Sequence, residues 1–155
     1  MADEKAKPSR EPPPERSLFS VFVPVTTRWK DNDPYGHLNN VVYYELFDAA
    51  VNQLLIERGL LDIAASPVIG LVVDSRCRFH ASLAFPDALE VGVLVEAIGR
   101  ASVNYRLAVF KSGAATAAAD GRYTHVYVDR ASNRPVEIPE PHRKAMEGWK
   151  KSAPG

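Results

Sequence analysis

The sequence has only one cysteine, Cys77, in 155 residues. A single thiol excludes a disulfide within the chain and is typical of proteins in a reducing compartment. An excess of charge of one sign is also lacking, because 19 lysines and arginines are balanced by 19 aspartates and glutamates. No basic run is long enough to follow a phosphate backbone, so we expect no nucleic-acid partner.

Long apolar runs and metal-ligand clusters are missing as well. No stretch approaches the roughly 20 apolar residues of a membrane span, and residues 1–16 lack the apolar core of a signal peptide. No group of cysteines, histidines and carboxylates has the spacing of a metal site. We therefore expect a soluble, cytoplasmic protein with no membrane span and no bound metal.

What is present has the length and composition of one globular domain. With 46% hydrophobic residues, the chain can bury a single core. Residues 1–17 contain four prolines, charges of both signs and so little apolar surface that we expect a disordered tail. The expected organisation is this tail, one domain over residues 18–150 and a frayed C-terminus over residues 151–155.

Apolar residues recur at helical spacing between residues 39 and 58, and Gly59 follows as a helix stop. They are Tyr43, Leu46, Phe47, Ala50, Val51, Leu54 and Leu55. Because this apolar face is wide, we expect other elements to wrap around the helix. Pro139 and Pro141 open a second, short helix that runs to about Trp149.

Five segments alternate between apolar and polar side chains with the period of two that strands show. They span residues 18–27, 68–81, 89–98, 102–111 and 115–129. Pro24 places the first strand near a sheet edge, and the short turns between the later strands favour antiparallel neighbours. This order predicts an α+β fold, in which a curled antiparallel sheet of five or six strands wraps around one long central helix.

A polar loop leads directly into the long helix and carries two carboxylates, a histidine and two asparagines. Its sequence, over residues 29–40, is WKDNDPYGHLNN. The first N–H groups of a helix have no intrahelical partner and lie at the positive end of the helix dipole. Such groups stabilise the oxygen of an attacked carbonyl as it becomes negative, so the loop suits acyl chemistry.

The loop also resembles a family signature. Residues 29–43, WKDNDPYGHLNNVVY, are similar to the pattern aromatic-x-D-x-D-x-x-G-H-V-N-N-x-x-Y of bacterial acyl-CoA thioesterases with the hotdog fold, the 4-hydroxybenzoyl-CoA thioesterase family. Further along the chain, Asp87 matches the aspartate that the family has just before the strand that begins near Leu89, although Pro86 stands where the family usually has glycine. The resemblance covers residues 19–145.

This resemblance implies the hotdog fold and an enzyme that hydrolyses a thioester to free acid and coenzyme A, with no cofactor. The substrate would be an acyl-CoA or an acyl-carrier-protein thioester. The resemblance also implies a homodimer or homotetramer, because the active sites of the family lie between subunits.

The family branch that uses a loop carboxylate places it at the second aspartate of the motif, which is Asp33. The resemblance therefore implies that Asp33 is the general base or the nucleophile. The alternative is a turn residue that sets the loop geometry before Pro34. His37 is a second candidate, which would orient Asp33, stabilise negative charge or cap the helix.

At the start of the helix, Asn39 and Asn40 suit capping and first-turn positions, which would satisfy unpaired N–H groups. The backbone N–H groups near Asn40 and Val41 are the expected donors to the developing oxyanion.

Other carboxylates have simpler interpretations. Asp31 is expected to be a solvated loop charge or a partner of Arg28 or Lys30. Another branch of the family uses a glutamate on the helix, for which Glu45 and Asp48 are the nearest candidates. Neither lies in a motif that selects it, so we expect both to face solvent.

Cys77 is expected to fill the core, and His80 and His125 to be structural. Coenzyme A carries phosphates that attract basic side chains. The candidates are Arg76, Arg78, Arg100 and Lys111. Exposed strand cations that protect sheet edges are the alternative interpretation.

Two other functions stay open from the sequence. A hotdog hydratase or dehydratase would act on enoyl or hydroxyacyl thioesters, but the hydratase pattern D-x-N-P-x-H is not reproduced, because one extra residue separates Asp31 from His37. A non-catalytic domain that binds acyl thioesters is the other alternative.

Overall fold

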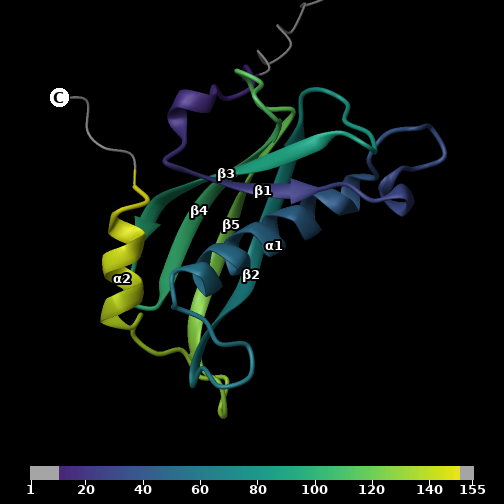
Figure 1. Cartoon of the computed structure of the whole chain (residues 1–155). Coiled ribbons are helices and arrows are strands. Elements are labelled where there is room, and N and C mark those ends of the chain that lie inside the picture. Colours follow the sequence, from purple (N-terminus) through teal and green to yellow (C-terminus); the bar gives the residue numbers. More distant parts are fainter. Residues whose placement is uncertain (1–10, 151–155) are drawn as a thin grey trace, which may run out of the picture.

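The computed structural model describes residues 11–150. One long helix, α1 (Asn40–Glu57), lies against the inner face of a curled five-stranded sheet (Figure 1). The strands are β1 (Val21–Thr26), β2 (Val68–Phe79), β3 (Ala88–Ile98), β4 (Ser102–Lys111) and β5 (Ala119–Asp129). Their order in the sheet is β1-β3-β4-β5-β2, and every pair is antiparallel. The α+β arrangement predicted from the sequence is confirmed.

The long helix follows its predicted boundaries to within about one residue. The Asn39 side chain caps its first turn by accepting a hydrogen bond from the Val41 N–H (3.2 Å). Gly59 ends it with a φ of 71°, a left-handed conformation that favours glycine. The buried face that packs against the sheet consists of Val42, Tyr43, Leu46, Phe47, Ala50, Val51, Leu54 and Leu55.

Close contact between α1 and the sheet depends on Gly121 of β5. A Cβ atom at this position would lie 1.9 Å from the backbone oxygen of Arg76 and 2.8 Å from the Phe47 ring. Any side chain larger than hydrogen would therefore separate β5 from β2 and push α1 away from the sheet.

A short helix, α2 (Glu140–Glu147), covers one end of the sheet beside β3 and β4 (Figure 1). Pro141 lies in its first turn, as expected. Met146 and Trp149 bury their side chains in the main core, so this helix closes the end of the domain. Among the described residues, no helix has the length and apolar character needed to span a membrane.

The N-terminal segment differs from the expectation of a disordered tail over residues 1–17. Pro14 is buried, and residues 16–18 form a 3-10 helix against the outer face of the sheet. The Arg16 N–H donates to the Ala115 oxygen (2.8 Å), and the Ala117 N–H donates to the Pro14 oxygen (2.9 Å). Residues 1–10 and the predicted frayed residues 151–155 lie outside the described residues.

Packing explains this difference. The Arg16 guanidinium lies over the Phe22 and Phe110 rings, at 4.6 and 5.0 Å from their centroids, and pairs with Glu90. The segment thereby covers a small outer core that the sequence pattern does not reveal. This outer core consists of Phe19, Leu94, Ala108, Phe110 and Ala117.

Candidate active site

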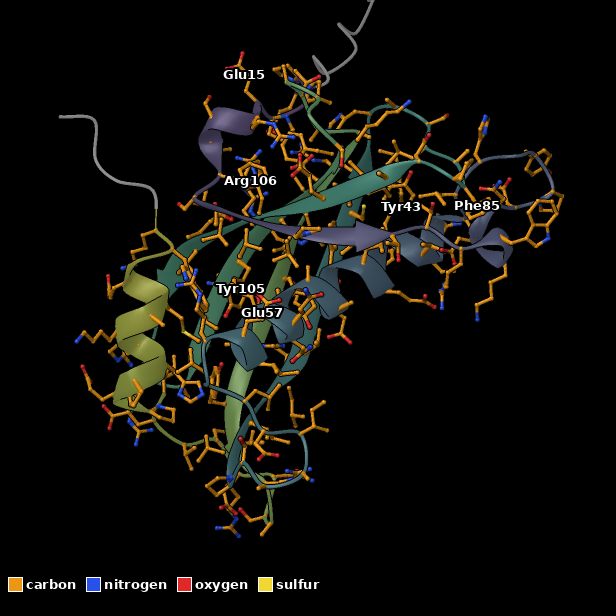
Figure 2. All side chains as sticks on the ribbon, viewed as in Figure 1. Glu15, Tyr43, Glu57, Phe85, Tyr105 and Arg106 are labelled. Carbon is orange, nitrogen blue, oxygen red and sulfur yellow. The ribbon has the colours of Figure 1, made fainter. Side chains whose placement is uncertain are left out.

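The loop and the start of α1 border a cavity of about 360 Å³ with the end of β2. Its lining residues are Asp33, His37, Leu38, Asn40, Tyr43, Phe79, His80, Ala81 and Ser82. Figure 2 shows Tyr43 and Phe85 at this end of the molecule. The structure thus brings both catalytic candidates from the sequence, Asp33 and His37, to one cavity.

Asp33 is half-buried and holds the loop with one carboxylate oxygen. Its Oδ1 accepts hydrogen bonds from the N–H groups of Tyr35 (2.8 Å) and His37 (3.2 Å). Gly36 completes the turn with a φ of 81°. Within residues 11–150, no donor is bound to Oδ2. One oxygen of Asp33 therefore has the turn role that the sequence allows, and the other oxygen has no donor among the described residues.

His37 is exposed and lines the same cavity. Its backbone contacts Asp33 twice: its N–H donates to Oδ1, and its carbonyl oxygen accepts from the Asp33 N–H (2.7 Å). Orientation of Asp33 by this residue is thus a backbone effect, and the imidazole is left to face the cavity.

The helix N-terminus differs in one respect from the sequence expectation. The Val41 N–H is taken up by the Asn39 side chain, so it does not serve as an oxyanion donor in this conformation. Asn39 has the capping role that the sequence favours. Asn40 lines the cavity, and its N–H is the first helix N–H without a partner among the described residues.

The second loop carboxylate, Asp31, is buried, with 2% of its surface exposed. It pairs with the Arg28 guanidinium (2.9 Å), as one of the two interpretations expected, and it also accepts from the Arg28 N–H (2.8 Å). Arg28 in turn binds the exposed Glu45 (2.9 Å). The solvated interpretation of Asp31 is wrong, because its side chain is buried and paired with Arg28.

Asp48 has a larger role than the solvent-facing one expected. Its Oδ1 accepts a hydrogen bond from the hydroxyl of Tyr123 on β5, and it also accepts from the Asn52 amide (3.1 Å). Burial, followed by this bond to Asp48, raises the pKa of Tyr123 well above its usual value. Asp48 therefore ties α1 to the sheet.

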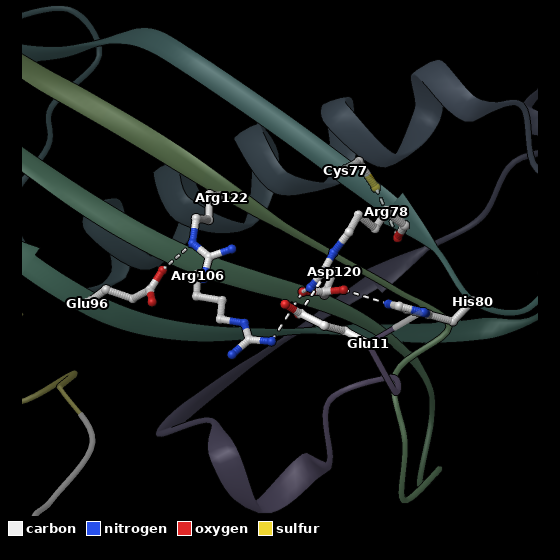
Figure 3. A network of polar contacts seen from close by, with 8 residues as sticks. All are labelled: Glu11, Cys77, Arg78, His80, Glu96, Arg106, Asp120 and Arg122. Atoms are coloured by element: carbon white, nitrogen blue, oxygen red, sulfur yellow. Dashed lines mark hydrogen bonds and ion pairs between the residues drawn. The ribbon is translucent and has the colours of Figure 1, made fainter. Parts of the chain in front are cut away.

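A polar network that no sequence pattern predicts lies on the outer face of the sheet (Figure 3). Its centre is Asp120, 1% exposed, which binds His80 (2.6 Å), Arg78 (3.1 Å) and Arg106 (3.4 Å). Burial alone would raise the pKa of Asp120, but the hydrogen bonds from His80 and Arg78 and the nearby arginine charges hold it below its usual value. Asp120 is therefore ionised near neutral pH.

The basic candidates for phosphate binding are mostly engaged with carboxylates. Arg78 pairs with Asp120 and with Glu11 (2.8 Å), Arg76 pairs weakly with Asp74 (3.5 Å), and Lys111 lies 3.6 Å from Asp87. Arg100 lies exposed in the turn between β3 and β4.

The remaining thiol and histidine are in apolar surroundings. Burial and the charge of Asp120 raise the pKa of Cys77 to about 12, so this thiol is unreactive near neutral pH. His125 is 1% exposed, and burial lowers its pKa to about 4. Both fit the core roles expected from the sequence. Residues 11–150 contain no group of three or more histidines, cysteines and carboxylates arranged to hold a metal ion.

Comparison with known proteins identifies the family. The family model described as "Thioesterase-like superfamily" matches residues 27–146. The solved structure of the PA5185 protein from Pseudomonas aeruginosa is similar over 92% of this chain and 100% of its own, with 51% identity and a TM-score of 0.89. A comparison with curated protein sequences gives no match.

More distant structures have the same fold. A 1,4-dihydroxy-2-naphthoyl-CoA thioesterase from Synechocystis matches 81% of this chain and 93% of its own, with 16% identity and a TM-score of 0.72. A gentisyl-coenzyme A thioesterase matches 81% of this chain and 99% of its own, with 21% identity and a TM-score of 0.72. The chain belongs to the thioesterase-like superfamily and has its hotdog fold, as the loop motif predicts.

Proposed function

We propose that this protein is an acyl-CoA thioesterase that hydrolyses a thioester to a free acid and coenzyme A. The observation that carries the proposal is the common cavity of about 360 Å³ that brings Asp33 together with the N-terminal end of α1. Thioester hydrolysis needs a positioned base or nucleophile and an N–H donor for the developing oxyanion. Asp33 and Asn40 supply these two groups.

In this mechanism the two oxygens of Asp33 have different tasks. Oδ1 is held by the N–H groups of Tyr35 and His37, which fixes the direction of the carboxylate. Oδ2 then acts on the substrate carbonyl, either directly or through a water molecule. The Asn40 N–H and the helix dipole stabilise the oxyanion. A thiolate leaves readily, so a strong general acid is not required.

The cavity wall favours an apolar or aromatic acyl group. The rings of Tyr43 on α1 and Phe79 on β2 meet edge to face, with centroids 5.0 Å apart. Burial raises the pKa of Tyr43 to about 12, so its hydroxyl stays neutral near neutral pH. Two of the similar structures, a 1,4-dihydroxy-2-naphthoyl-CoA thioesterase and a gentisyl-coenzyme A thioesterase, are named for aromatic acyl-CoA compounds.

We propose that the protein assembles as a homodimer or homotetramer in the cytoplasm. β2 forms one edge of the sheet, and it pairs only with β5 among the described strands. Two neighbouring apolar residues of this edge, Val72 and Val73, are 45% and 61% exposed. An open strand edge with exposed apolar side chains is typical of a surface that a second copy covers.

The test combines substrate screening with a matched pair of variants. Purified protein is incubated with a panel of acyl-CoA thioesters and a thiol reagent that detects free coenzyme A. Asp33→Asn should lower kcat by orders of magnitude while binding and folding persist, because asparagine still accepts the two loop hydrogen bonds but is neither base nor nucleophile. Glu45→Gln, on the exposed face of α1, is the control and should retain activity.

Other outcomes would contradict the proposal. Conversion of an enoyl-CoA with the thioester intact would indicate a hydratase, and binding without turnover would indicate a non-catalytic domain. An inactive Glu45→Gln together with an active Asp33→Asn would move the site to the helix. A monomer with full activity at micromolar concentration would contradict the proposed assembly.

A further inference from the structure

A second polar residue, His80, lines the cavity that contains Asp33. His80 follows β2 directly, and its N–H continues the sheet ladder by donating to the Ala118 oxygen (2.8 Å). The His80 side chain is 7% exposed, and its Nε2 lies 2.6 Å from the Oδ1 of Asp120. His80 also lines the cavity that contains Asp33 and Asn40. His80 therefore belongs both to the outer-face network, drawn in Figure 3, and to the cavity wall.

The charge of Asp120 determines the tautomer of His80. Arg78 and Arg106 both contact the other oxygen of Asp120 and keep this carboxyl ionised. An ionised carboxylate can only accept hydrogen bonds, so the Nε2 of His80 must carry a hydrogen and donate it. In the neutral imidazole, Nδ1 then has a free lone pair.

The second ring nitrogen, Nδ1, is available as a hydrogen-bond acceptor. Nδ1 of His80 has no hydrogen-bond partner among the described residues. This atom is also not fully buried, whereas Nδ1 of His125 is fully buried and has no partner. A neutral His80 with its Nε2 hydrogen directed at Asp120 thus has an unpartnered acceptor, in a residue that lines the same cavity as Asp33.

We propose that His80 is a further catalytic residue, whose Nδ1 accepts one hydrogen of the attacking water while Asp33 Oδ2 accepts the other. Asp120 is a positioning residue that fixes the tautomer and the ring orientation of His80. This inference rests on the proposed thioesterase function, in the form in which Asp33 is a general base.

The chemical step balances without any further reactant. The water oxygen forms a bond to the carbonyl carbon, and its proton passes to Asp33. The tetrahedral intermediate then breaks the carbon–sulfur bond, and the departing thiolate receives that proton. The products are the carboxylic acid and the free thiol, while His80 keeps its own proton throughout and serves as an acceptor.

Two substitutions separate the nitrogens of His80. In His80→Gln, the amide can replace Nε2 and keep the hydrogen bond to Asp120, but nothing replaces Nδ1. In His80→Asn, the shorter amide can place its oxygen near the Nδ1 position, but the bond to Asp120 is lost. Arg122→Gln is the control, because Arg122 lies on the same outer face and pairs with Glu96 (3.0 Å).

The two His80 variants should differ in opposite ways in kcat and in melting temperature. His80→Gln should keep the wild-type melting temperature and KM but lose about 10- to 100-fold in kcat. His80→Asn should melt at a lower temperature, since Asp120 loses a charge-assisted bond, yet retain a higher kcat than His80→Gln. Arg122→Gln should match the wild type in kcat.

A purely structural His80 gives the opposite pattern, with His80→Gln fully active and His80→Asn impaired in both respects. That result, obtained with an active wild type and an inactive Asp33→Asn, would overturn this inference and leave the thioesterase function intact. A wild type that hydrolyses no thioester in the panel would overturn both.

Discussion

Two buried histidines lie on opposite faces of the same sheet, and their surroundings make them different chemical groups. His80, on the outer side, faces the ionised Asp120 and also lines the cavity that contains Asp33. His125, on the inner side, lies among tyrosine rings, with Nε2 3.1 Å from the Tyr123 hydroxyl and Nδ1 sealed without a partner. A charged partner and a path to solvent, rather than burial itself, therefore distinguish a candidate functional histidine from a core histidine.

The largest effect should come from removing the charge on the outer face. Asp120→Asn leaves Arg78 and Arg106 without their carboxylate and removes the acceptor of His80. We expect the free energy of unfolding to fall by about 3–5 kcal/mol, the range for a buried ion pair broken on one side. Urea denaturation monitored by circular dichroism measures this change.

The pH dependence of the unfolding free energy of Asp120→Asn tests whether Asp120 is ionised in the folded protein. Because folding lowers the pKa of Asp120, its stabilisation is complete above the ordinary carboxyl value of 3.8 and is lost as the pH falls through the lower folded value. The acid loss of stability in this range should therefore be shallower in Asp120→Asn. An unchanged acid profile would show that the network does not hold an ionised carboxylate.

The inner-face histidine, His125, should also reduce stability as the pH falls, but over a higher pH range, because burial makes it resist protonation. Burial lowers the pKa of His125 from 6.5 to about 4, so the unfolded chain takes up a proton in this interval before the folded chain does. Stability should therefore fall as the pH drops from 6.5 to 4, by on the order of 3 kcal/mol.

His125→Gln tests this effect, because glutamine keeps a polar group near Tyr123 but does not titrate. Thermal unfolding between pH 4 and 7 should show a smaller slope in the variant. Part of the slope should persist, since burial also lowers the pKa of His142 on α2. An identical slope in both proteins would contradict the neutral, core role of His125.

A smaller effect is expected where the N-terminal segment covers the outer face. Deleting residues 1–17 removes the two backbone hydrogen bonds of Pro14 and Arg16 and exposes part of the outer core. We expect a loss of about 2 kcal/mol in unfolding free energy, from two hydrogen bonds and the associated burial. Deleting residues 1–10 alone leaves these contacts in place and is the matched control. Equal stability of both truncated proteins and the full chain would support the sequence-based prediction of a disordered tail over residues 1–17.

Several features of this protein were determined by the sequence alone. The spacing of apolar residues placed α1 to within about one residue, because a helix must bury one continuous face. The alternation in the later segments gave four of the five strands with small shifts at their ends. The motif of residues 29–43 predicted the family and brought Asp33, His37 and Asn40 together, because these residues are neighbours along the chain.

Other features were decided only by the tertiary structure. His80 and Asp120 meet because β2 pairs with β5 in one particular register, and no local pattern specifies the register of strands separated by about 40 residues. The contact of Arg16 with the outer core also joins distant segments, which composition cannot reveal. Periodicity states which face a side chain occupies, whereas the charge or ring that it meets there depends on how those faces are brought together.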